Sequence, residues 1–169
     1  MDYFDVIQNR HSVRSYQPDP VEPEKLQQIL ETARLAPTAA NRQQYKIIVI
    51  NTAGKKEELN KMYKREWFLE LEAPLIIGVC SIPQKCWIRS DQKNYSDVDA
   101  AIVMDHIVLA ATALGLGTCW MGGFDLKVAK EVLDLDEEWE PIAFTPLGYA
   151  QPKPFKKVRK PLEELVVYK

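Results

Sequence analysis

The chain has 169 residues and a formal net charge of −2, with 46% hydrophobic and 27% charged residues. This composition is typical of a single globular domain, and the mild acidity excludes a global basic field that would recruit nucleic acid or an anionic membrane. Any anion must therefore be bound by a local cluster of cations. Cys80, Cys86 and Cys119 form no C-x-x-C pair, which favours reduced thiols. With neither a secretory signal pattern nor an apolar run of membrane-spanning length, we expect a cytoplasmic protein.

The pattern of apolar residues predicts helices interspersed with strands. Helices are indicated by apolar positions three and four residues apart, and strands by short β-branched or continuous apolar runs. A polar loop covers residues 82–96, and Pro146 in the last strand favours a sheet edge or a bend. In order, we expect helix 2–9, a helix from Pro23 to Pro37, strand 45–50, helix 55–71, strand 75–80, helix 98–114, helix 125–134 and strand 140–149.

The helix over residues 98–114 is apolar nearly all round, which places it in a core or at a subunit interface. Ser96 and Asp99 resemble a capping box at its start, with Asp in place of Glu or Gln. His106 is interpreted as a satisfied core histidine rather than a catalyst. The mixed order of helices and strands indicates a three-layer α+β sandwich.

The stretch Arg10-His11-Ser12-Val13-Arg14 is a candidate anion site. Its guanidinium groups are permanent cations with a planar donor fork that matches phosphate, and Ser12 adds a neutral donor. An isolated R-x-x-x-R spacing more often marks surface charge, so the interpretation depends on other segments. Lys157 and Arg159 add two cations on one face if the basic tail is extended.

Two loops between these cationic segments supply neutral polar groups. Asn41 and Gln43 carry amides that can bind the edge of a heterocycle, and Gly122 and Gly123 let the backbone approach a ring closely. The Rossmann fingerprint, the Walker A loop and the H-E-x-x-H motif are absent. With two histidines in the chain, a histidine-rich metal site is excluded, and we expect no metal.

Four segments together resemble the FMN-dependent nitroreductase family, in order and over almost the whole chain. They are Arg10-His11-Ser12-Val13-Arg14 with Tyr16, Ala36-Pro37-Thr38-Ala39-Ala40-Asn41-Arg42-Gln43, Gly115-Leu116-Gly117-Thr118-Cys119-Trp120-Met121-Gly122-Gly123-Phe124, and Lys157-Val158-Arg159-Lys160-Pro161-Leu162-Glu163-Glu164. The chain looks like a short member of that family. Two features differ from the family pattern: Gln43 is followed by Gln44 and Tyr45 instead of Pro-Trp, and the segment covering the flavin is short.

The resemblance implies an α/β/α sandwich with a mostly antiparallel sheet and a buried central helix at a homodimer interface. It implies one FMN-binding domain over residues 1–169, whose tail, from about 151 to 169, extends onto the partner subunit. The implied cofactor contacts are Arg10, His11, Ser12, Arg14, Thr38, Ala39, Asn41, Gln43, Trp120, Met121, Gly122, Gly123, Lys157 and Arg159.

The resemblance also assigns roles to these contacts. Arg10, Ser12, Lys157 and Arg159 would hold the phosphate and ribityl end, and Arg14 would lie near the pyrimidine edge. His11 would contact the cofactor through its backbone. The segment from residue 38 to 43 would line the ring from the partner subunit. The segment from residue 120 to 123 would pass along the ring, with the backbone of Gly122 near flavin N5.

By this resemblance the protein is an FMN-dependent oxidoreductase. NAD(P)H would deliver hydride to the flavin and leave, and a nitroaromatic, a quinone or a similar small acceptor would then take its place, giving ping-pong kinetics without a side-chain acid or base. Trp87 and Tyr95 either line the acceptor pocket or serve packing. The alternatives are a flavin destructase or reductive dehalogenase of the same superfamily, a flavin-binding module without turnover, and a dimerisation domain without a cofactor.

Overall fold

A four-stranded antiparallel sheet forms the middle layer of the molecule, in the order β1-β2-β4-β3. The computed structural model describes residues 1–153 and 155–169. The strands are β1 (Tyr45–Asn51), β2 (Leu75–Ser81), β3 (Gly117–Thr118) and β4 (Glu140–Gly148).

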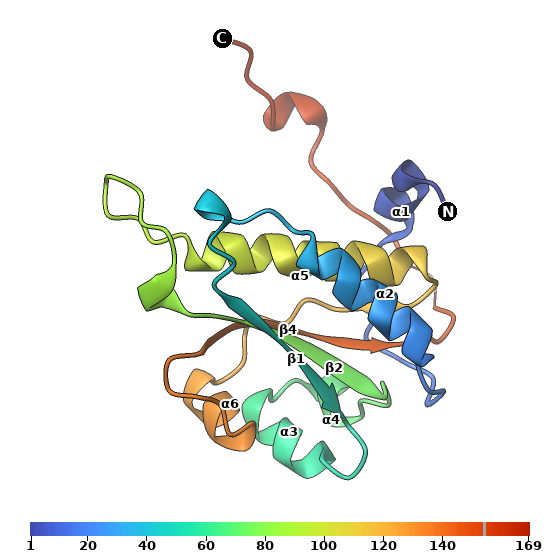
Figure 1. Cartoon of the computed structure of the whole chain (residues 1–169). Coiled ribbons are helices and arrows are strands. Elements are labelled where there is room, and N and C mark those ends of the chain that lie inside the picture. Colours follow the sequence, from blue (N-terminus) through green and yellow to red (C-terminus); the bar gives the residue numbers. More distant parts are fainter. Residues whose placement is uncertain (154) are drawn as a thin grey trace.

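Helices cover both faces of this sheet (Figure 1). On one face lie α2 (Pro23–Arg34) and α5 (Ser96–Ala113), and on the other lie α3 (Lys56–Met62), α4 (Glu66–Leu69) and α6 (Leu126–Val132). β2 is buried by both layers, which explains why it is a continuous apolar run. The prediction of a three-layer α+β sandwich with an antiparallel sheet is confirmed.

The main core lies between α5 and the sheet. Val103, Met104, Ile107 and Ala111 of α5 are fully buried and belong to one cluster with residues of β2 and β4. The ring nitrogen Nδ1 of His106 lies 2.9 Å from the Ile102 carbonyl oxygen, so the histidine is satisfied within its own helix, as expected, although it is half-buried rather than part of the core. Among the described residues, no helix has both the length and the apolar character needed to cross a bilayer.

The helix expected over residues 55–71 is interrupted. Tyr63 has an extended backbone (φ −140°, ψ 102°), and the Met62 carbonyl accepts from the amide of Asp125 rather than continuing the helix. The rings of Tyr63, Trp67 and Phe68 pack edge to face on one another. Tertiary packing of these aromatic residues therefore overrides the helical periodicity of the segment.

Two further local predictions are wrong. Ser96 and Asp99 form no capping box, because Tyr95 is the N-cap residue and the Asp99 carboxylate bonds to Ala39 instead. Of the two alternatives for Pro146, a sheet edge and a bend, the edge is wrong for the strand as a whole, because β4 runs between β2 and β3, although β3 pairs only with Leu147 and Gly148. The bend stays a prediction. Beside Pro146 the Cys119 amide donates to the Thr145 hydroxyl at 2.9 Å, so the ladder is interrupted where proline has no N–H to offer.

Candidate functional site

The stretch from Arg10 to Arg14 leaves the end of α1 (Tyr3–Asn9) and lies beside β3. The Val13 amide donates to the Thr118 carbonyl at 2.8 Å, and the Val13 side chain is buried. Because side chains alternate along an extended backbone, burial of Val13 leaves Ser12 and Arg14 exposed on the other side. The local fold therefore presents the serine and the arginine to solvent.

The C-terminal tail runs back along this stretch. The backbone amide of Gln151 donates to the Ser15 carbonyl at 3.0 Å. The rings of His11 and Phe155 stack, with their centroids 3.6 Å apart and an interplanar angle of 8°. Further on, the Lys157 ammonium group donates to the carbonyls of Ile7 and Gln8 at the end of α1, at 2.8 and 2.7 Å. Two segments about 150 residues apart in sequence thus form one site.

The structure brings the predicted phosphate-binding residues together. A cavity of about 250 Å³ is lined by Arg10, Ser12, Arg14, Lys157 and Arg159, with His11, Phe155 and Lys156 beside them. Desolvation, followed by the charges of Arg10 and Arg159, lowers the pKa of Lys157 below its usual value. An anion in the cavity would relieve this crowding of like charges, so the donor set fits a phosphate group.

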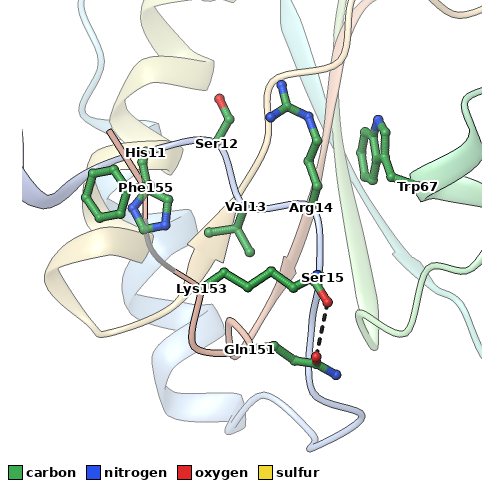
Figure 2. A pocket seen from close by; sticks show the side chains of 9 residues that line it. All are labelled: His11, Ser12, Val13, Arg14, Ser15, Trp67, Gln151, Lys153 and Phe155. Carbon is green, nitrogen blue, oxygen red and sulfur yellow. Dashed lines mark hydrogen bonds between the residues drawn. The ribbon is translucent and has the colours of Figure 1, made fainter. Parts of the chain in front are cut away.

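A second cavity of about 340 Å³ adjoins the first and shares His11, Ser12, Arg14 and Phe155 with it. Figure 2 shows the Arg14 guanidinium group on the same side as the Trp67 ring, with the stacked His11 and Phe155 rings opposite. The volume falls in the usual range of small-ligand sites, about 300–1,000 Å³. Aromatic walls suit a flat ring system, and the cation beside them favours a ring that can carry negative charge.

Trp67, Gln151, Lys153 and Phe155 line this cavity but were missed at the level of sequence. Trp67 falls within the helix that the sequence predicts over residues 55–71. It reaches the cavity because the helix is interrupted at Tyr63, and no local sequence signal marks that interruption clearly. Gln151, Lys153 and Phe155 could have been predicted to lie near the site, because they precede Lys157 by a few residues in the same basic segment of the sequence.

The loop of residues 38–43, which we call the amide loop, lines neither of the two cavities in its own subunit. Thr38, Ala39, Asn41 and Gln43 lie near the N-terminal end of α5, where the Ala39 amide donates to the Asp99 carboxylate at 2.8 Å. Residues 40, 41 and 43 have left-handed φ values of 51°, 53° and 54°. Such a backbone is uncommon outside glycine and persists only where surrounding contacts hold it.

The segment from Trp120 to Gly123 is also absent from the lining of the two cavities. The Met121 side chain is buried in the core, and its backbone exchanges two hydrogen bonds with Phe144, at 2.8 and 3.0 Å. Trp120, Gly122 and Gly123 are exposed. Any ligand contact of this segment must therefore come from these three residues or from the backbone.

Comparison with known proteins identifies the family to which this fold belongs. A sequence model described as the nitroreductase family matches residues 7–81 and 73–149. The chain belongs to the nitroreductase family. The predictions of this family and of a nitroreductase-like oxidoreductase are confirmed by that match.

Individual relatives extend over most of this nitroreductase-family chain. The crystal structure of a nitroreductase family protein from Clostridium difficile 630 is 38% identical, with a TM-score of 0.87 and coverage of 99% of this chain and 98% of that one. An FMN-dependent nitroreductase from Clostridium difficile R20291 is 27% identical, with a TM-score of 0.79 and 98% coverage of both chains. A Bacillus subtilis FMN reductase [NAD(P)H] is 25% identical over 173 residues, covering 93% of this chain and 69% of its own length.

Proposed function

We propose that this nitroreductase-family protein binds FMN in the two adjoining cavities and transfers hydride from NAD(P)H to a small acceptor such as a nitroaromatic or a quinone. The observation that carries the proposal is the convergence of Arg10, Arg14, Lys157 and Arg159, from both ends of a net-acidic chain, on one cavity. The names of the relatives, an FMN-dependent nitroreductase and an FMN reductase, support the same cofactor.

In this proposal the residues that line the two cavities have different roles. Arg10, Lys157 and Arg159 bind the phosphate through charge-assisted hydrogen bonds. Arg14 lies between the two cavities and places a fixed positive charge beside Trp67, where it stabilises negative charge on a reduced ring. Bound FMN supplies the hydride-transfer chemistry. NAD(P)H and the acceptor use the same open space in turn, which gives ping-pong kinetics.

We further propose that the working unit is a homodimer, because two exposed segments of each subunit, the amide loop and the apolar end of the tail, line neither cavity of their own chain. In this proposal the amide loop contributes to the site of the partner subunit. The tail leaves the body beside α1 and points into solvent (Figure 1). Its apolar residues are exposed, including Leu165 at 61% and Val167 at 78%. Such a tail fits a docking surface on a second copy of the chain.

Polar substitutions in the tail test the dimer. Replacing Leu162, Leu165 and Val167 together with serine is expected to weaken the dimer about a thousandfold or more, because each buried aliphatic side chain contributes about 1.5 kcal/mol or more. Sedimentation over a concentration series measures this change. Glu163→Gln with Glu164→Gln is the matched control in the same segment, and it should leave the dimer intact. A wild-type monomer at all concentrations, or a serine variant as dimeric as the control, would contradict the proposal.

The buried cysteines support a reducing, cytoplasmic location, which we propose on that ground. Cys80, Cys86 and Cys119 are unpaired, and burial raises the pKa of Cys80 to about 12. Thiols held in the protonated form react slowly, so these three groups behave as packing residues. No step of the proposed reaction uses them.

The visible spectrum of the purified protein tests the function directly. We expect a yellow protein whose flavin absorption is bleached within seconds by anaerobic NADH or NADPH and restored by a nitroaromatic or a quinone. A colourless protein that takes up no added FMN would favour a dimerisation domain. Bound flavin that nicotinamides reduce slowly would favour a binding module, and fragmentation of the flavin in air would favour a destructase.

A further inference from the structure

Asp99 is a buried carboxylate that lies outside the two cavities. It belongs to the first turn of α5 and is 3% exposed. One carboxylate oxygen, Oδ1, accepts from the Ala39 amide at 2.8 Å, and the other, Oδ2, has no partner among the described residues. Burying a carboxylate is unfavourable unless it makes strong hydrogen bonds, so this position requires a physical reason.

The contact with Ala39 is made at the start of the amide loop. Within the loop, the backbone amides of Asn41 and Arg42 donate to the carbonyls of Thr38 and Ala39 at 2.9 and 3.2 Å. The Gln43 backbone amide donates to the Thr38 hydroxyl at 3.1 Å, and the Gln43 side chain donates to the Asn41 carbonyl at 3.2 Å. All four of these bonds join neutral groups, whereas the bond to Asp99 has a carboxylate as its acceptor. At its far end the Gln44 carbonyl accepts from the Ile82 amide at 3.1 Å. Asp99 is therefore the charged anchor at the near end of a loop with three left-handed residues.

Stabilising the helix does not explain the burial of Asp99. A negative charge in the first turn favours a helix through the macrodipole, but the exposed Asp97 in the same turn already supplies that charge. An exposed carboxylate would stabilise the helix in this way without the cost of being removed from water. The direct bond to Ala39 is the property that distinguishes Asp99 from its neighbour.

We propose that Asp99 is a positioning residue for the flavin site of the partner subunit: it holds the Ala39 amide so that the loop keeps the strained shape that directs Asn41 and Gln43 toward the cofactor. This inference rests on the proposed function, because the loop has a ligand to position if FMN binds at the dimer interface. Asp99 itself touches neither cavity.

Three substitutions separate this role from general stability. Asp99→Asn keeps a side-chain carbonyl oxygen for the Ala39 amide, whereas Asp99→Leu keeps the branched shape with the same number of heavy atoms and removes the acceptor. Asp97→Ala is the matched control, because it removes an acidic residue from the same helical turn without contacting the loop. Amide hydrogen exchange of residues 38–43 is measured in the flavin-free protein, and FMN affinity is measured by quenching of flavin fluorescence.

In Asp99→Leu we expect the hydrogen-exchange rate of the Ala39 amide to rise about tenfold and the affinity for FMN to fall about tenfold. The reason is the loss of a hydrogen bond to a charged group. Asp99→Asn should restore both quantities to within about threefold of the wild type, and Asp97→Ala should change neither. The proposal is overturned if Asp99→Leu leaves loop exchange unchanged, or if Asp99→Asn is as defective as Asp99→Leu. If the wild-type protein binds no FMN, the proposed function fails, and the exchange data still decide whether Asp99 anchors the loop.

Discussion

Replacing Arg10 and Arg159 together with alanine is expected to weaken FMN binding about a thousandfold, so that the protein no longer co-purifies with the cofactor. Both side chains line the cation cavity, and each charge-assisted bond to phosphate is worth about 2 kcal/mol. Lys157 remains in this variant, but part of its bonding capacity is used by the carbonyls of Ile7 and Gln8. Flavin content of the purified protein and titration of the apoprotein with FMN measure the effect.

The matched control removes two positive charges elsewhere on the surface. Arg34 and Lys127 are exposed, line neither of the two cavities, and form ion pairs with Glu31 and Glu131 at 2.8 and 3.9 Å. Arg34→Ala with Lys127→Ala should therefore bind FMN as the wild type does, and loss of these surface pairs should change stability little. Full flavin occupancy in the Arg10 and Arg159 variant would place the phosphate site elsewhere.

A single methyl group at Gly117 should damage both stability and cofactor binding. A Cβ atom there would lie 2.9–3.0 Å from three carbon atoms of Val13, among them the Val13 Cβ. Since Val13 is β-branched and buried, it cannot rotate away, and the whole stretch from Arg10 to Arg14 must shift. Gly117→Ala is expected to reduce the free energy of unfolding by about 1–3 kcal/mol and to lower Tm by roughly 2–4 °C for each kcal/mol.

Gly123→Ala provides the control for stability, because within the described part of the chain no atom beyond its immediate neighbours lies within 4 Å of the added Cβ. Its Tm should stay within about 1 °C of the wild type. In Gly117→Ala, FMN affinity should fall together with Tm, because the displaced strand carries Ser12 and Arg14. A Gly117→Ala variant with wild-type stability would show that β3 and the arginine stretch are not in close contact in solution.

Much of the fold follows from the sequence because the signals are local. The β-branched run at Tyr45–Asn51, the apolar run at Leu75–Ser81 and Pro23 at the start of α2 each correspond to an observed element. The prediction failed where distant residues decide the outcome. The bond from Asp125 to Met62 interrupts the helix over 55–71, and the contact with Ala39 removes Asp99 from any capping box.

The residue types alone predict the chemistry of the site, namely two cationic pairs, the amide loop and a glycine pair, because charge and hydrogen-bonding capacity belong to individual residues. Which of these groups meet depends on the tertiary structure. It brought Lys157 and Arg159 beside Arg10 and Arg14 because the tail pairs with residues 15–17, and it added Trp67. It also left the amide loop outside the cavities of its own chain, because long-range contacts, which no local pattern encodes, fix the distances between segments.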